Sequence, residues 1–239
     1  MAAEQAGRSM AGVRFCGEVS AAVSHEIKNV LAIIKETAGL LGDHAARALA
    51  EEQQLPPEQV REATGAIDRQ VRRADGIVRR LNRFAHSVDR ESEGVELGES
   101  CRLLAELATR LLAGRSATLQ VVVPEQEVTV QASRFRLLHF LWRGLESVLA
   151  ATGPGARLQL VVSARCETAG TADAPGTPGI HGAAKTVPGG HLELSWQAGE
   201  VVGSGAPEFP GPAELELLAQ LAAEFELNPE EQRFVLLLP

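Results

Sequence analysis

The 239-residue sequence contains no tyrosine, and aromatic residues make up only 4% of it. Its hydrophobic content of 45% is still ample for a packed interior, so we expect a core of Leu, Val and Ala rather than of rings. Cysteine is also scarce, because Cys16, Cys101 and Cys166 are odd in number and form no CxxC pair. This usage indicates a reducing compartment with buried or unused thiols.

Excess basic charge and long apolar runs are lacking as well. The net charge is -8 and the isoelectric point is near 5.3, a balance that argues against a nucleic-acid binder. There is no apolar run long enough for a transmembrane helix, and the opening "MAAEQAGRSM" lacks the pattern of a secretory signal. We therefore expect a cytoplasmic protein that binds neither nucleic acid nor membrane.

The first part of the chain has helical periodicity without strand alternation. Pro56 and Pro57 in "EEQQLPPEQV" end one helix and open the next, which predicts an antiparallel helical hairpin over residues 1–92. Pairing of two hairpins into a four-helix bundle would cover their apolar stripes, so we expect a homodimer. The seam positions alternate in spacings of four and three residues. They are Val23, Ile27, Val30, Ile34, Thr37 and Leu41, then Val60, Thr64, Ile67, Val71, Ala74, Val78, Leu81, Ala85 and Val88.

Residues 93–239 change to mixed helical and strand patterns, which predict an α+β fold. Ser133 is a plausible N-cap and Gly153 a plausible stop for a helix over 133–152. We expect helices on one face of a mixed sheet, an α/β sandwich. The other expected helices are 97–113 and about 212–226, and the expected strands are "ATLQVVVP" and "EVTVQA" around a turn, "ARLQLVVSAR", "GHLELSWQ" and "RFVLLLP".

Residues 24–34, "SHEIKNVLAII", place a histidine among polar residues at the start of an apolar run. With Ile27 at heptad position a, His25 falls at position f, facing away from the seam, with Asn29 one turn along and Glu26 beside it. An imidazole that receives a phosphoryl group must be reachable and must present an unprotonated nitrogen, and an exposed histidine meets both conditions at neutral pH. The same position also suits a histidine that is merely solvated.

This segment resembles the H-box of the dimerisation and histidine-phosphotransfer domain of two-component sensor histidine kinases. The consensus of that family reads Ser-His-Glu-(Ile/Leu)-(Lys/Arg)-Asn-Pro-Leu, and here Val30 replaces the proline, which implies a straighter helix. The resemblance implies that His25 is the phosphoacceptor and that Glu26 orients or deprotonates its imidazole. It implies that Asn29 places the transferring group or a hydrolytic water.

The second half resembles, in layout only, the ATP-binding domain that follows this hairpin in the family. Ser147 and Ala150 stand where the family has a magnesium-binding asparagine and a basic residue. "QAGEVVGSG" stands where the family has an Asp-x-Gly-x-Gly turn, and "SGAPEFPGP" is a reduced lid. These departures imply a degenerate domain without ATP binding. We expect no cofactor or metal on this chain, and magnesium on a partner receiver domain.

Cationic side chains cluster on the second helix outside its seam. They form either a solvated face or a surface that steers an acidic partner, such as the acidic pocket of a response-regulator receiver domain. The residues expected to bind that partner are Lys28, Arg72, Arg79, Arg80 and Arg83.

The leading hypothesis is a histidine phosphotransferase of a two-component phosphorelay. It would pass a phosphoryl group between receiver aspartates through His25. Autokinase activity is not expected. Two alternatives stay open, namely a divergent active sensor histidine kinase and a non-catalytic pseudokinase scaffold that binds response regulators. The expected partners are receiver domains and a second copy of the chain, with a hybrid sensor kinase as a further candidate.

Overall fold

The computed structural model describes residues 2–165, 189–198 and 207–239. The chain divides into two compact units, one of Val13–His86 and one of Ser87–Pro239 together with Met1–Gly12. The domain limits 1–92 and 93–239 stay a prediction. Cys166 lies outside the described residues.

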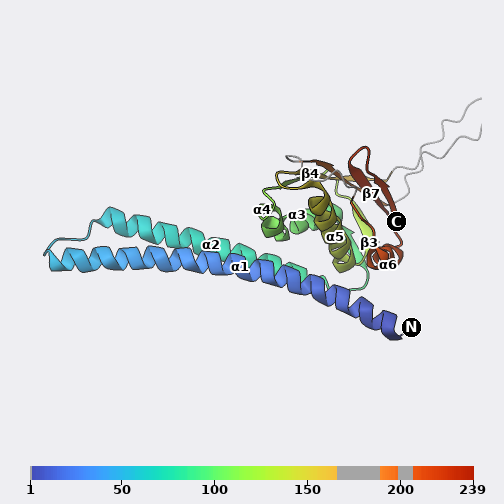
Figure 1. Cartoon of the computed structure of the whole chain (residues 1–239). Helices are drawn as coiled ribbons and strands as arrows, with labels where there is room; N and C mark the ends of the chain where they lie inside the picture. Colours follow the sequence, from blue (N-terminus) through green and yellow to red (C-terminus); the bar gives the residue numbers. More distant parts are fainter. Residues whose placement is uncertain (1, 166–188, 199–206) are drawn as a thin grey trace, which may run out of the picture. The chain divides into compact units, whose positions relative to one another are not determined.

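The helical hairpin is confirmed. Helix α1 (Ala2–Ala50) and helix α2 (Pro57–His86) lie side by side in opposite directions, and Pro57 is the first residue of α2, as expected (Figure 1). Near the open end of the hairpin, the rings of Phe15 and Phe84 pack edge to face with centroids 5.3 Å apart. No helix in the described part of the chain has both the length and the apolar character needed to cross a membrane.

The seam of the hairpin agrees with expectation on α1 and only in part on α2. Val23 and Val30 of α1 are buried. On α2, Ile67, Ala74 and Leu81 of the expected seam are half-buried, whereas Val71 and Val78 are exposed. The buried residues of α2 are Ile77 and Phe84, and half-buried positions outside the expected seam include Gln59, Ala63, Ala66 and Gln70.

The second unit is the expected sandwich, with helices on one face of a mixed sheet. Parallel pairing joins β2 to β4, and the other ladders of the five-stranded sheet, ordered β2-β4-β5-β7-β6, are antiparallel. The helices are α3 (Leu97–Leu107), α4 (Thr109–Ala113), α5 (Arg134–Thr152) and α6 (Pro212–Leu221). The strands are β1 (Glu93–Glu96), β2 (Thr118–Val122), β3 (Thr129–Ala132), β4 (Arg157–Ala164), β5 (Gly190–Gln197), β6 (Glu224–Asn228) and β7 (Arg233–Leu238).

Three elements differ from expectation. The helix expected over 97–113 is interrupted at Ala108, next to Thr109, whose hydroxyl donates to the carbonyl oxygen of Glu106 and competes with the helical ladder. Strand β3 pairs with β1, which was not predicted, and does not form a hairpin with β2. The last helix is shorter than expected because Ala222 adopts a left-handed conformation, and β6 follows it.

The ends of α5 are as predicted. The Ser133 hydroxyl accepts a hydrogen bond from the backbone N–H of Arg136, and Gly153 follows the last turn with a φ of 73°. Behind α5, four of the seven phenylalanines form one cluster, with Phe209 and Phe225 each within 5.7 Å of Phe234 between ring centroids. Phe140 completes this cluster. The core is therefore mainly aliphatic, but its few rings are concentrated beside α5.

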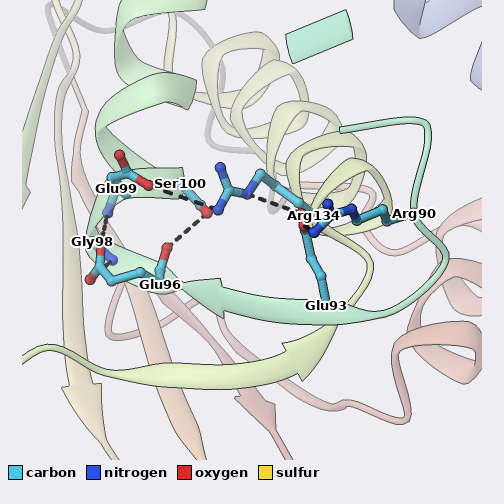
Figure 2. Close-up of polar contacts among 7 residues, drawn as sticks. All are labelled: Arg90, Glu93, Glu96, Gly98, Glu99, Ser100 and Arg134. Carbon is cyan, nitrogen blue, oxygen red and sulfur yellow. Dashed lines mark hydrogen bonds and ion pairs between the residues drawn. The ribbon is translucent and has the colours of Figure 1, made fainter. Parts of the chain in front are cut away.

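The start of the second unit is fixed by an ionic cluster on β1, α3 and α5 (Figure 2). The Arg134 guanidinium lies 3.5 Å from Glu93 and 3.8 Å from Glu99, and Arg90 lies 3.4 Å from Glu93. The Glu96 carboxylate caps α3 by accepting from the backbone N–H of Gly98 at 2.8 Å and from that of Glu99. These contacts connect the segment that follows α2 to the first turns of α3 and α5.

Cys101 is the buried thiol that the composition predicted. It is fully buried in α3, and burial, together with the nearby Glu96 carboxylate, raises its pKa to about 12. A thiol with that pKa stays protonated at neutral pH and is a poor nucleophile.

Replacing Gly144 of α5 by alanine should destabilise the second unit. An added Cβ would lie 2.9 Å from Cζ of Phe234, whose buried ring has no room to retreat within the aromatic cluster. We expect Gly144→Ala to cost about 1–3 kcal/mol of unfolding free energy, measured by denaturant titration. The control Gly76→Ala has open space around its Cβ and should be neutral or stabilising. Equal stability of the two variants would contradict this packing account.

Candidate functional site

His25 lies on the exposed side of α1, as its heptad position predicted. The amide nitrogen Nδ2 of Asn29 lies 3.3 Å from Nδ1 of the His25 ring, one helical turn away. Helix α1 continues through Val30, which is completely buried in the seam. The phosphoacceptor candidate and its amide neighbour are thus presented to solvent by a helix whose opposite side is anchored.

Glu26 points away from His25 and toward the second helix. Its carboxylate lies 3.4 Å from the Arg80 guanidinium, and only 14% of the Glu26 side chain and 26% of the Arg80 side chain are exposed. Successive residues of an α-helix are rotated by about 100°, so neighbours in sequence do not face each other. The structure therefore brings His25 together with Asn29, and Glu26 together with Arg80.

The cations expected to bind a partner occupy different environments. Arg72 pairs with Asp68 at 2.9 Å and Arg79 pairs with Asp75 at 2.6 Å, both in exposed ion pairs one turn apart on α2. Arg80 pairs with Glu26, as described. Lys28 and Arg83 are exposed. The positive surface of α2 is therefore partly neutralised by carboxylates of the same hairpin.

The pair of Glu26 and Arg80 was not recognised from the sequence, although a signal for it was present. With Ile27 at heptad position a, Glu26 falls at position g, and residues at e and g commonly form ion pairs between the helices of a coiled coil. The observed seam of α2 places Arg80 beside Ile77 and Leu81, at the edge of that interface. The partner of Glu26 could be identified only after the register of α2 was known.

A cavity of about 350 Å³ lies in the second unit, beside α5 and the start of α6. Arg143 stands in it between two carboxylates, contacting Glu146 and lying 3.2 Å from Glu214. Glu214 also accepts from the backbone N–H of Gly211 and so caps α6. Ser147, Ala150 and Glu208 line the same cavity. Its described lining thus combines three carboxylates with one guanidinium.

Groups that could hold a metal ion are absent from the part of the chain that the structure describes. No three or more His, Cys, Asp or Glu side chains gather there in a suitable arrangement. Ser163 and His191, which form a hydrogen bond across β4 and β5 at 2.8 Å, have no such companions.

The hairpin matches a known domain family. Residues 17–88 match the His Kinase A (phospho-acceptor) domain. This HisKA segment contains α1 from residue 17 onward, all of α2 and the whole His25 site, so the expected resemblance to histidine kinases is confirmed there. No protein of curated function matches the chain.

Several solved histidine kinases are similar to this chain at low identity and low TM-score. The Acinetobacter baumannii histidine kinase AdeS is 10% identical, with 90% of this chain and 96% of that chain covered and a TM-score of 0.43. The Erythrobacter litoralis EL346 blue-light activated histidine kinase is 16% identical over 81% of this chain and 62% of that one, with a TM-score of 0.43. Histidine kinase ThkA, in complex with the response regulator protein TrrA, is 14% identical over 95% and 62%, with a TM-score of 0.41. Sequence identities and TM-scores this low do not show that the proteins share an activity or a partner with this chain.

Removing the guanidinium of Arg143 should loosen the second unit, because Glu146 and Glu214 would then face each other without a cation. Arg143 is partly exposed, so we expect Arg143→Ala to lower the unfolding free energy by only about 1 kcal/mol. Thermal unfolding followed by circular dichroism measures this, with Arg157→Ala, an exposed arginine of β4, as the control. Equal melting temperatures for the two variants would show that the cluster contributes no stability.

Proposed function

We propose that this protein is a histidine phosphotransferase that works without ATP. His25 accepts a phosphoryl group from the aspartyl phosphate of one receiver domain and passes it to another. The observation that carries the proposal is the exposed position of His25, in contact with Asn29, inside the segment that matches a phospho-acceptor domain. A histidine that is merely solvated needs neither that segment nor an amide one turn away.

The chemistry is a balanced exchange of one bond for another. A lone pair of the His25 ring attacks phosphorus, the bond from phosphorus to the aspartate oxygen breaks, and its electron pair stays on the receiver's carboxylate. Nε2, the ring nitrogen farther from the Asn29 amide, is the proposed attacking atom, and its lone pair is free in the tautomer that carries the ring proton on Nδ1. The reverse step transfers the group to a second receiver, and the receiver holds the magnesium ion that balances phosphoryl charge.

Glu26 and Asn29 have complementary roles in this proposal. Asn29 orients the ring through Nδ1 and places the transferring group or a hydrolytic water. Glu26 supplies negative charge for the ring, which becomes cationic once it carries the phosphoryl group. That role requires the Glu26 carboxylate to leave Arg80, since the two are paired in this structure.

The chemistry of the cavity beside α5 supports the absence of ATP binding. A triphosphate needs cationic or N–H donors and, through magnesium, hard oxygen ligands. The described lining places Glu146, Glu208 and Glu214 around one arginine that is already paired, and Ser147 and Ala150 stand where the kinase family has its magnesium and basic residues. This donor set does not fit a triphosphate.

A receiver domain is the proposed partner of the hairpin surface around His25. Lys28 and Arg83 are exposed, and Arg72 and Arg79 are paired with Asp68 and Asp75. Exposed cations steer an acidic partner mainly by raising its association rate. ThkA, one of the structurally similar kinases, is known in complex with a response regulator, which is compatible with a partner of this class.

A second copy of the chain is the proposed partner for the apolar side of α2. Val60, Val71 and Val78, spaced at helical intervals, are 37%, 52% and 43% exposed, and Leu31 of α1 is 56% exposed. A row of exposed valines along one helix is costly in water unless another surface covers it. Pairing of two hairpins into a four-helix bundle would bury this row.

Label transfer tests the proposed activity. Phosphorylated receiver domains, prepared with a small-molecule phosphodonor, are incubated with the protein beside a reaction that contains Mg-ATP alone. We expect acid-labile label on the wild type after incubation with a phosphorylated receiver. His25→Gln should carry at least about 100-fold less label, because the nucleophile is gone. Incubation with Mg-ATP alone should give no label. His44→Gln, which alters another exposed histidine of α1, should behave as the wild type.

The alternatives give different results in the same experiment. Label from Mg-ATP alone would contradict the proposal and indicate an active kinase. Transfer that persists in His25→Gln would exclude His25 as the acceptor, and no label under any condition would favour a non-catalytic scaffold.

Introducing charge into the valine row should separate the dimer without unfolding the helices. We expect Val71→Asp and Val78→Asp to shift the protein to the monomer in size-exclusion chromatography with light scattering, because a carboxylate at a buried interface is strongly unfavourable. Leu215→Asp, at an exposed apolar residue of α6, should leave the dimer intact. A wild-type protein that is already monomeric would refute the proposed pairing.

A further inference from the structure

Strand β1 is the first strand of the second unit, and it is weakly integrated into the sheets. In the described sheets it pairs with β3 alone, in a two-stranded antiparallel sheet that is separate from the five-stranded one. It has four residues, of which Val95 is completely buried. A ladder this short is marginally stable by itself, so side-chain contacts determine how firmly β1 is attached.

Arg134, the first residue of α5, fastens the start of β1 (Figure 2). Its guanidinium lies 3.5 Å from the Glu93 carboxylate, and each of these two side chains is only 19% exposed. Nε of Arg134 is buried and makes no hydrogen bond within the described part of the chain. Its charge is therefore compensated by Glu93 and, at 3.8 Å, by Glu99. A guanidinium removed from water to this extent requires a carboxylate nearby, and β1 supplies the closer one.

The ion pairs of the preceding segment are more exposed. Arg136 lies 3.9 Å from Glu91, whose side chain is 92% exposed, and Arg90 is 71% exposed where it approaches Glu93. Exposed pairs of this kind contribute little, because water and salt screen them. The half-buried contact of Arg134 with Glu93 is therefore the ion pair on which the position of β1 mainly depends.

The other end of β1 is held in a different way. Glu96, its last residue, accepts hydrogen bonds from the backbone N–H groups of Gly98 and Glu99 and so caps α3. These bonds stay within the first turn of α3 and do not require the pairing of β1 with β3. Residues Glu93–Val95 can therefore leave β3 while Glu96 remains in place as the cap.

We propose that residues Glu93–Val95 form a detachable strap, fastened by the ion pair of Arg134 with Glu93, that sets the length of the tether between the hairpin and the second unit. Helix α2 ends at His86 and β1 begins at Glu93, so the tether comprises residues 87–92 while the strap is attached. When the strap detaches, the tether comprises residues 87–95. At about 3.4 Å per residue, its greatest reach rises from about 20 Å to about 31 Å.

The attached state predominates, because detachment has several costs. It exposes Val95, breaks the ladder with β3 and removes the nearer carboxylate from Arg134. Opening of the strap is thus an infrequent local event, which becomes more frequent when salt weakens the ion pair. Each opening gives the second unit a wider range of positions relative to the end of α2. The inference concerns the tether and does not rest on the proposed phosphotransfer.

Hydrogen exchange of the intact protein measures the opening of the strap. We expect the amides of β1 to exchange about fivefold faster in Arg134→Met and in Glu93→Gln, the factor that corresponds to loss of one partly exposed ion pair. Amides of β5, which has a paired strand on each side, are the reference within each sample. Glu91→Gln is the matched control, because it removes an exposed carboxylate two residues earlier and should leave β1 as in the wild type.

Salt provides a second readout, which a mere packing role of the Arg134 side chain would not change. Raising sodium chloride from about 0.1 M to about 1 M shortens the screening length from about 10 Å to about 3 Å. We expect exchange of β1 relative to β5 to rise by about threefold in the wild type. In Arg134→Met and Glu93→Gln this ratio should not depend on salt, because the ion pair is already absent.

Two outcomes would overturn the inference. One is exchange of β1 in Arg134→Met and Glu93→Gln that equals that in Glu91→Gln. The other is exchange of β1 at the same opening frequency as β5, which would show that the strap does not detach separately from the sheet. Circular dichroism establishes that each variant is folded. The salt series uses the wild-type protein, so it tests the strap even where a variant fails to fold.

Discussion

The rotation of about 100° between successive residues of a helix is the constraint on which the His25 site depends. It turns Val23 and Val30 into the seam, Glu26 toward Arg80, and His25 with Asn29 toward solvent. These environments are fixed together, because burial of the valines sets the rotation of the whole segment. A reactive histidine can be held accurately at a surface only if the opposite side of its helix is packed in this way.

The hairpin could be predicted in much more detail on α1 than on α2. On α1 the large apolar residues are also the buried ones, so periodicity identified the seam, the exposure of His25 and the neighbouring position of Asn29. On α2 two apolar rows lie side by side. The expected row of Ile67, Ala74 and Leu81 is half-buried, whereas Val71 and Val78 are exposed and Ile77 and Phe84 are buried in their place. Which row packs inside a protomer is decided by the fit of side-chain shapes between helices, and periodicity does not contain that information.

In the second unit, local interactions could be predicted from the sequence, whereas interactions between distant segments could not. Ser133 and Gly153 were recognised as the ends of α5 because capping is a local interaction. The pairing of β3 with β1 and the position of β6 depend on contacts between segments distant in sequence, and were not recognised. The cluster of Arg143 with Glu146 and Glu214 is likewise nonlocal, since α6 supplies Glu214. The proposed loss of ATP binding was inferred from residue substitutions alone, and the carboxylates that line the cavity beside α5 are consistent with that proposal.

The two units therefore contribute differently to the proposed function. In the proposal, the hairpin carries the phosphoacceptor His25 with Glu26 and Asn29, and it offers the surfaces for a receiver and a second copy. The second unit retains a packed aromatic cluster and a capped α6, and the described lining of its cavity has three carboxylates and one arginine. Phosphorus NMR of the intact protein, recorded after incubation with a phosphorylated receiver and, separately, with Mg-ATP, tests the central claim most directly. The account predicts a phosphohistidine signal on Nε2 after incubation with the receiver and none after Mg-ATP. A signal that arises from Mg-ATP alone, or the absence of a phosphorus–nitrogen signal with every receiver, would contradict it.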